Sequence, residues 1–243
     1  MTDWDFNGEG VMMLVDKPLD WTSFDVVHKI KVLFHANRVG HAGTLDPRAT
    51  GLLIVCTGKK TKSIDEYVAE EKEYTGTLEL GITTPSFDSE TEVSERKEYS
   101  TLTLQQVEDA FNDFRGIQDQ TPPMYSAVKL RGKPLYKYAR KGRTVERASR
   151  MVDVRALEIT AFNLPLVEFR VVCSKGTYVR SLVNDIGAQL ACGAVLRALR
   201  RTRIGNFSVN DARTIEELIE LKQSLILAGT MYDYRSAALG TLV

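Results

Sequence analysis

The chain has 243 residues, of which 43% are hydrophobic and 26% charged, and its 32 Lys and Arg balance 32 Asp and Glu. This composition is that of a globular protein and excludes the collagen-like, disordered and disulfide-scaffold classes. The length suits one large domain or two small ones. Taken alone, a net charge of zero argues mildly against a protein that binds nucleic acid.

Neither a metal site nor a membrane segment is predicted. The three cysteines and three histidines show no zinc-ligand spacing, and Cys56 and Cys173 lie in apolar stretches that are typical of buried residues. The N-terminus is acidic, unlike a secretory signal, and no apolar run approaches the roughly 20 residues of a membrane span. We therefore expect a reduced, cytoplasmic protein without a metal.

Helices and strands are predicted in an irregular alternation. The first half predicts a strand at 11–15, a helix capped by Ser23, a glycine-rich loop at 40–51, a buried strand at 52–56, a short helix at 62–69 and a strand at 74–80. The second half predicts a helix from Thr103 to Gly116, a loop at 121–150, strands at 152–162, 167–173 and 199–209, a helix marked by apolar residues from Leu182 to Leu190 and a terminal helix after Thr214. The adjacent strand pairs favour an α+β fold around one mixed sheet.

The zero net charge conceals two regions of opposite charge. Residues 126–213 hold 18 Lys and Arg against 6 Asp and Glu, whereas the remainder holds 14 against 26. The segment 121–150, which we call the basic arm, carries nine Lys and Arg between Lys129 and Arg150, interleaved with tyrosines. Basic side chains neutralise phosphates and aromatic rings stack on unpaired bases, so the arm suits a polynucleotide. A solvated basic loop is the alternative on charge alone.

Asp46 is the candidate reactive group on physical grounds. It precedes Pro47, which favours an extended backbone at Asp46, and it lies between Gly43 and Gly51 in a tight loop. A carboxylate held in this way before a buried strand has a fixed position and is not mobile in solvent. His41 lies five positions earlier in the same loop. An ordinary Asp-Pro turn is the alternative, and spacing alone favours that alternative.

The segment from Gly40 to Leu53, GHAGTLDPRATGLL, closely resembles the catalytic motif of TruB-type pseudouridine synthases, which act on uridine 55 in the T-loop of tRNA. Four more blocks of that family occur in the family's order: Asp16-Lys17-Pro18, Lys72-Glu73-Tyr74, Pro123-Met124-Tyr125-Ser126-Ala127 and Lys175-Gly176-Thr177-Tyr178-Val179-Arg180. Five ordered blocks within residues 11–210 are highly specific. The resemblance implies a pseudouridine-synthase-like fold, with a mixed, largely antiparallel sheet flanked by helices and a mobile basic loop.

By this resemblance Asp46 is the catalytic aspartate, which acts without a cofactor as a nucleophile or as a base at the sugar. Arg180 matches the arginine that pairs with this aspartate, and Tyr74 matches the tyrosine that stacks on the flipped uracil. His41 matches the histidine that displaces the target nucleotide, and the basic arm matches the mobile loop. The remaining implied substrate-binding residues are Lys17, Tyr178, Lys129, Lys133 and Lys137.

The resemblance also implies one catalytic domain at residues 1–213, followed at 214–243 by a helix and tail in place of the C-terminal RNA-binding domain of many relatives. We expect a monomeric isomerase whose partner is the T-stem-loop of tRNA. Asp20 departs from the family pattern, which often has glycine there. Two other hypotheses are a noncatalytic RNA-binding module, which would not need Asp46, and a glycosidic hydrolase, which would need a further acid or base to activate water.

Overall fold

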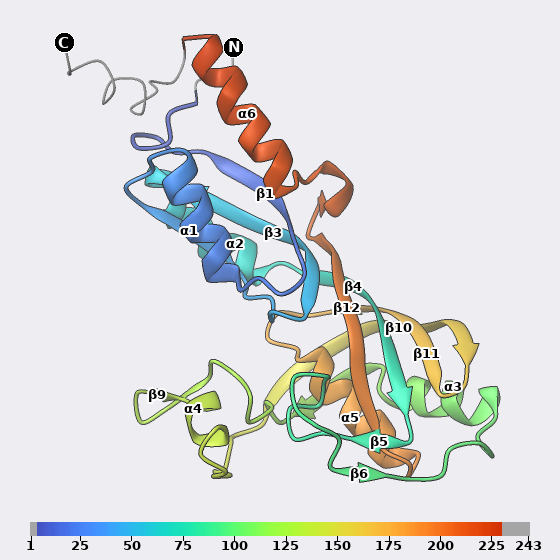
Figure 1. The fold of residues 1–243 in the computed structure, drawn as a ribbon. Helices are drawn as coiled ribbons and strands as arrows, with labels where there is room; N and C mark the ends of the chain where they lie inside the picture. Colours follow the sequence, from blue (N-terminus) through green and yellow to red (C-terminus); the bar gives the residue numbers. More distant parts are fainter. Residues whose placement is uncertain (1–3, 230–243) are drawn as a thin grey trace. The chain divides into compact units, whose positions relative to one another are not determined.

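The computed structural model describes residues 4–229, which fall into two compact units (Figure 1). The first unit comprises the residues up to Val68 together with those from Phe207 onward. The second unit comprises Ala69–Asn206. Each unit contains strands and helices of its own, and each is described by itself below.

The first unit is built on three antiparallel strands. β3 (Ala49–Thr57) lies between β1 (Met12–Lys17) and β2 (Val39–Ala42). The pairing places Met13 opposite Val55 and Val15 opposite Leu53, so these apolar side chains share one face. The remaining elements of this unit are α1 (Ser23–Leu33), a 3-10 helix (Gly58–Ser63), α2 (Ile64–Ala69, which ends at the unit boundary), β13 (Phe207–Ser208), a 3-10 helix (Val209–Asp211) and α6 (Ile215–Leu227).

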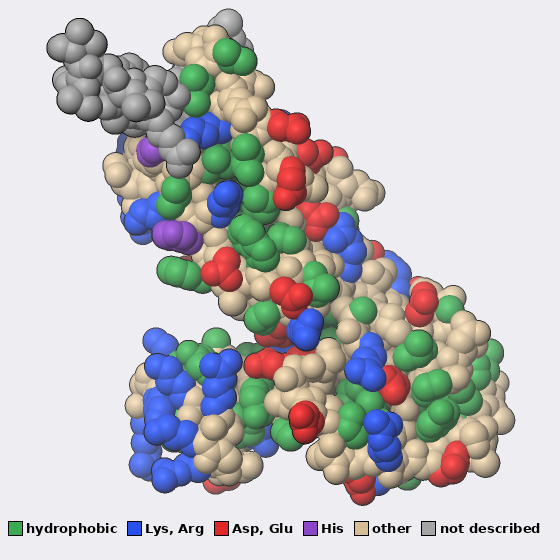
Figure 2. Space-filling view, in the orientation of Figure 1, with side chains coloured by type: hydrophobic (Ala, Val, Ile, Leu, Met, Phe, Trp, Pro, Cys, Tyr) green, Lys and Arg blue, Asp and Glu red, His purple; other side chains and the backbone are tan. Residues whose placement is uncertain are grey.

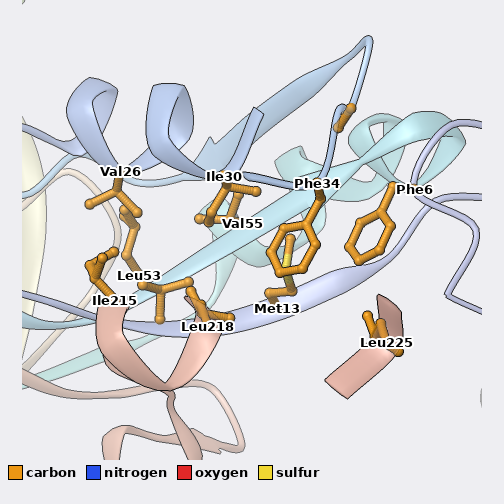
Figure 3. Packing of buried hydrophobic residues seen from close by; sticks show 12 residues of the cluster. Phe6, Met13, Val26, Ile30, Phe34, Leu53, Val55, Ile215, Leu218 and Leu225 are labelled. Carbon is orange, nitrogen blue, oxygen red and sulfur yellow. The ribbon is translucent and has the colours of Figure 1, made fainter. Parts of the chain in front are cut away.

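The core of the first unit joins this sheet face to helices α1 and α6 (Figure 3). Helix α1 contributes Val26 and Ile30 at helical spacing, with Phe34 directly after the helix. Helix α6 contributes Ile215 and Leu218 to the same cluster. Burial of these side chains fixes both helices, and thereby the loops on either side of them, relative to β1 and β3.

The residue that caps α1 lies one position before the predicted cap, Ser23. The N-cap is Thr22, whose side chain accepts the amide proton of Asp25, while the Asp25 carboxylate accepts from the Thr22 amide. This reciprocal pair satisfies two backbone donors and takes the cap from Ser23, which is buried. The predicted caps at Thr103 and Thr214 are confirmed, each with its capping box.

The second unit contains five antiparallel strands in the order β12-β4-β11-β10-β7. Their bounds are β4 (Lys72–Leu80), β7 (Gly116–Gln120), β10 (Arg150–Asn163), β11 (Leu166–Cys173) and β12 (Ala194–Ile204). Helix α3 (Leu104–Asp113) packs on β10, and α5 (Val179–Gln189) packs on β12. A short pair, β5 (Ile82–Thr83) and β6 (Glu95–Arg96), completes the unit outside the basic arm. The predicted α+β class with a largely antiparallel sheet is confirmed.

Two predicted boundaries are wrong. The strand predicted at 199–209 is β12, which begins at Ala194 directly after a turn at Gly193 and ends before a second turn at Gly205. Both glycines have positive φ, 76° and 52°, which allows the chain to reverse direction at each of them. The pattern of apolar residues alone does not indicate these two strand ends. The loop predicted at 40–51 is shorter, because β2 and β3 enclose it from both sides.

None of the helices between residues 4 and 229 has the length and apolar character that crossing a bilayer requires.

Replacing Ile30 by alanine should lower the free energy of unfolding by about 2–5 kcal/mol, because it leaves a cavity in the core of the first unit. Ile30 is fully buried, whereas Val32 on the same helix is 53% exposed. The control Val32→Ala should change the free energy of unfolding by less than about 0.5 kcal/mol. Chemical denaturation followed by circular dichroism measures both, and equal losses would contradict this assignment of the buried face of α1.

Candidate active site

Asp46 lies in the connection between β2 and β3. Its carbonyl oxygen accepts the amide proton of Ala49 at 3.0 Å, so Asp46 to Ala49 form a tight turn with Pro47 at the second position. Gly43, three residues before Asp46, has φ +79° and lets the chain leave β2 sharply. Asp46 itself is half-buried. The predicted placement of this carboxylate on a short, constrained loop before a buried strand is confirmed.

Two side chains from outside the connection hold it in place. The Ser23 hydroxyl accepts the amide proton of Leu45 at 2.9 Å and donates to the Leu45 carbonyl at 3.1 Å. The ammonium group of Lys17, at the end of β1, donates to the carbonyls of Pro18 at 2.8 Å, Trp21 at 2.6 Å and Pro47 at 3.4 Å. Lys17 is fully buried, so these carbonyls replace water around its charge. Lys17 therefore supports the Asp46 turn from within the unit.

Asp20, where the resemblance leads us to expect glycine, adopts the left-handed backbone conformation. Its φ is +62°, a region that Asp tolerates better than most residues. The amide of Asp20 donates to the Pro47 carbonyl at 2.9 Å, and its carboxylate pairs with Arg48 at 3.0 Å. The departure at residue 20 thus preserves the turn and adds an ion pair beside the Asp46 loop.

His41 lies on β2, where its backbone is opposite Val55 of β3. His41 is half-buried, and Asp46 follows five positions later in the same hairpin. Lys17 on β1, His41 on β2 and Asp46 in the β2–β3 connection therefore all lie in the first unit, and Lys17 bonds the residue after Asp46.

Arg180, in the first turn of α5, is buried in the second unit. Its guanidinium donates to the carbonyls of Ser86 at 3.0 Å and Tyr125 at 2.9 Å, and it pairs with the carboxylate of Asp88 at 3.5 Å. The side chains of Arg180 and Asp88 are only 4% and 6% exposed. An ion pair this deeply buried needs its additional hydrogen bonds to offset the loss of hydration.

Sequence reasoning missed Asp88. The carboxylate of Asp88 accepts the amide proton of Glu90 at 2.9 Å, and the Thr84 hydroxyl donates to the Asp88 carbonyl at 2.7 Å. Thr84, Ser86 and Asp88 are all buried, although all three are polar. These three residues occur at every second position after the strand predicted at 74–80, and this pattern could have identified Asp88. Polar residues at inward-facing positions indicate a buried hydrogen-bonded group.

Tyr74 lies on the inward face of β4, as the alternation with Leu78 and Leu80 predicted. It is 9% exposed and is paired across the sheet with Val171 and Arg201. Lys72, two residues earlier on the same face, is also buried, and burial followed by the charge of Arg201 lowers its pKa to about 8.

Tyr178 is the N-cap residue of α5, and its ring is half-buried. The guanidinium of Arg150 lies 5.0 Å from the centre of the Tyr178 ring, in a cation–π contact. Tyr178 and Arg180 are thus held at the same helix end, two residues apart.

The basic arm contains regular structure, although the sequence predicts only a loop at 121–150. It forms β8 (Lys129–Leu130), β9 (Lys133–Pro134) and α4 (Tyr136–Ala139). The hairpin turns at Arg131 and Gly132, both with positive φ, and Leu135 is 1% exposed beneath it. A two-residue turn with arginine at its first position gave no recognisable hairpin signal in the sequence, because that position usually holds Asn, Asp or Gly.

Basic side chains gather on the surface around α4 and β9 (Figure 2). Lys129 and Lys137 are exposed, while the ammonium of Lys133 lies 4.8 Å from the centre of the Tyr138 ring. Arg140 lies similarly over Tyr136. These contacts hold cations and aromatic rings together on one surface, which is the combination that binds phosphates and unpaired bases.

The cysteines are free thiols, and all three are buried. Burial raises the pKa of Cys56 and of Cys173 to about 11, so neither thiol ionises near neutral pH. Within residues 4–229, the His, Cys, Asp and Glu side chains form no group of three that could hold a metal ion.

Comparison with known sequences links this site to one family. Residues 31–179 match the profile described as TruB family pseudouridylate synthase (N terminal domain), and residues 180–228 match the tRNA pseudouridylate synthase B C-terminal domain. A protein of Chloroherpeton thalassium named tRNA pseudouridine synthase B is 49% identical over 87% of this chain and 90% of its own length. A Flavobacterium johnsoniae protein of the same name is 46% identical over 84% of this chain and 92% of its own length.

Solved structures show the same fold. A chain in the crystal structure of a Cbf5-Nop10-Gar1 complex superposes with a TM-score of 0.72 at 29% identity, over 90% of this chain and 56% of that one. A structure of an H/ACA RNP bound to a substrate RNA containing 2′-deoxyuridine gives a TM-score of 0.68 at 26% identity, over 90% of this chain and 55% of that one. This chain therefore spans just over half the length of these structural relatives.

Asp88→Asn should lower the free energy of unfolding by about 3 kcal/mol, because it removes the charge of one member of the buried Arg180–Asp88 ion pair. Glu90 in the same loop provides a control, since its ion pair with Arg140 is solvent-exposed. Glu90→Gln should cost less than about 1 kcal/mol. Urea denaturation of both variants tests this, and a smaller loss for Asp88→Asn than for Glu90→Gln would contradict the assigned pair.

Proposed function

Because the chain belongs to the TruB family of pseudouridylate synthases, we propose that it converts uridine 55 in the T-loop of tRNA to pseudouridine. The observation that carries the proposal is the 49% identity to a tRNA pseudouridine synthase B over nine-tenths of that protein's length. The constrained Asp46 turn supports the proposal, because it holds the carboxylate of the family motif in a defined position.

The reaction breaks the bond between N1 of uracil and C1′ of the ribose and forms a bond between C5 and C1′. N1 gains a proton and C5 loses one, so the product is an isomer of the substrate and no cofactor is consumed. The Asp46 carboxylate is the reactive group, acting as a nucleophile or as a base at the sugar. The turn at Pro47 and the buried Lys17 fix its backbone, which lowers the entropic cost of aligning it with the nucleotide.

The same reaction assigns roles to two residues of the second unit. Tyr74 supplies an aromatic ring for the uracil, which loses its stacking neighbours when it leaves the T-loop. Arg180 supplies a buried guanidinium, which favours the ionised form of a carboxylate. Its hydrogen bonds to Ser86 and Tyr125 hold that charge in a fixed position.

RNA binding is assigned to the basic arm together with His41 and Tyr178. The exposed Lys129 and Lys137 and the half-buried Lys133 neutralise phosphates of the T-stem-loop. His41 helps to displace the target nucleotide from the T-loop, and Lys17 acts indirectly, through the Asp46 loop that it supports. In this proposal residues 1–213 form the catalytic domain, and α6 after Thr214 packs on it through β1.

Incubation of a tRNA transcript with the purified protein should yield one pseudouridine at position 55, and Asp46→Asn should abolish that product because it removes the reactive charge. Affinity for tRNA should be retained in the variant. Product is mapped by carbodiimide-dependent reverse-transcription stops, and binding by filter retention.

Asp65→Asn, which changes an exposed carboxylate of the same unit, is the control and should retain activity. Binding of tRNA without any product by the wild-type protein would favour the noncatalytic RNA-binding alternative. Release of free uracil instead of pseudouridine would favour a hydrolase. Ordinary turnover by Asp46→Asn would show that the catalytic assignment is wrong.

Changing Lys129, Lys133 and Lys137 together to glutamine should weaken tRNA binding and reduce the slope of log Kd against log salt concentration by about 2, if each lysine contacts one phosphate. The matched control changes the same three residues to arginine, which keeps the charges and should keep the slope. Binding isotherms at several salt concentrations measure both. Identical slopes for the two triple variants would remove these lysines from the RNA contact surface.

A further inference from the structure

The basic arm leaves the sheet and returns to it at a single strand pair. Gln120 ends β7 and Arg150 begins β10, and the two residues are directly opposite each other. Both ends of the arm contact the short segment that starts α5. Arg150 stacks on Tyr178, and the Ser181 hydroxyl donates to the carbonyl of Thr121 at 2.9 Å. The base of the arm is therefore tied to the same helix end that carries Arg180.

Gln120 makes the most direct of these connections. Its side chain is 2% exposed, its amide nitrogen donates to the Tyr178 carbonyl at 3.1 Å, and its amide oxygen accepts the Tyr178 backbone proton at 2.7 Å. One side chain thus pairs with both backbone groups of Tyr178, as a residue on a neighbouring strand would. The Tyr178 side chain makes no capping hydrogen bond at the N-cap position, and Gln120 satisfies the backbone amide of this residue instead.

Arg180 follows Tyr178 by two residues, and its head group also contacts the arm. The guanidinium donates to the carbonyl of Tyr125, five residues after Gln120. The Arg180 side chain is therefore held through its backbone by the Gln120–Tyr178 pairing and at its tip by Tyr125, Ser86 and Asp88. A displacement at the base of the arm changes two of these supports at once.

We infer that Gln120 is a positioning residue, whose side-chain amide fixes the start of α5 against the base of the arm and thereby sets the position of the Arg180 guanidinium. The inference rests on the proposed function, in which Arg180 takes part in catalysis. Gln120 does not itself reach the reacting atoms, since both of its polar atoms are bonded to Tyr178. Its loss should slow the chemical step more than it weakens tRNA binding, because the basic side chains of the arm stay in place.

The test replaces Gln120 by methionine, which has nearly the same length but neither donates nor accepts strongly. The single-turnover rate constant at saturating tRNA should fall about 10- to 100-fold, as expected for a misplaced catalytic group. The Kd for tRNA should change by less than about threefold, because the phosphate contacts are retained. If Gln120→Met does not fold, Gln120→Glu keeps the acceptor for the Tyr178 amide, and its rate constant should still fall because a carboxylate faces the Tyr178 carbonyl.

Gln118→Met is the matched control. Gln118 lies on the same strand, and its side chain donates to the carbonyl of Phe114 at 2.6 Å instead of to α5. Both its rate constant and its Kd should stay within about twofold of the wild-type values. A rate constant for the Gln120 variants equal to that of Gln118→Met, or a loss of rate matched by an equal loss of affinity, would overturn the inference.

Amide hydrogen exchange of Tyr178, followed by NMR in the absence of RNA, provides a second readout. Exchange should be faster in Gln120→Met than in the wild-type protein and unchanged in Gln118→Met, because only the first variant removes the acceptor of that amide proton. Unchanged exchange in Gln120→Met would overturn the inference. A wild-type protein that forms no pseudouridine would count against the proposed function, and the exchange comparison would then still decide whether Gln120 holds Tyr178.

Discussion

The buried ammonium group of Lys17 is the interaction on which the geometry of the Asp46 loop depends. A charge removed from water must be surrounded by acceptors, and here the carbonyls of Pro18, Trp21 and Pro47 take that place. Those three residues belong to two chain segments that are far apart in the sequence. One cation therefore fixes both the approach to α1 and the turn after Asp46, and the Ser23 hydroxyl reinforces the same junction.

The second unit uses a similar arrangement around Arg180. A cation in the first turn of a helix is electrostatically unfavourable, because the helix N-terminus carries partial positive charge. The carbonyls of Ser86 and Tyr125 and the carboxylate of Asp88 offset this cost. Such a group is fixed only while its partners remain in place. The partners of Arg180 come from the loop at Thr84–Thr91 and from the arm, so residues that take no part in the reaction contribute to the position of its guanidinium.

Local features of the fold were predictable because they depend on residues close together in the sequence. The capping boxes at Thr103 and Thr214 and the alternation along β4 needed only neighbours within a few positions. The wrong assignments have equally local causes. Thr22 competes with Ser23 for the same cap, and Gly193 and Gly205 reverse the chain inside an otherwise continuous apolar pattern. The hairpin at Arg131-Gly132 uses a turn residue that sequence patterns do not favour.

The sequence by itself determined the family resemblance, the opposite charges of the two regions and the placement of Asp46 in a proline turn, since each of these is a property of contiguous residues. Only the tertiary structure decided that Asp88 pairs with Arg180, that Lys17 is buried beneath the Pro47 carbonyl and that Gln120 pairs with Tyr178. These contacts join residues 30 to 92 positions apart. Spacing carries no information about such pairs, because they form only when separate strands and helices pack against one another.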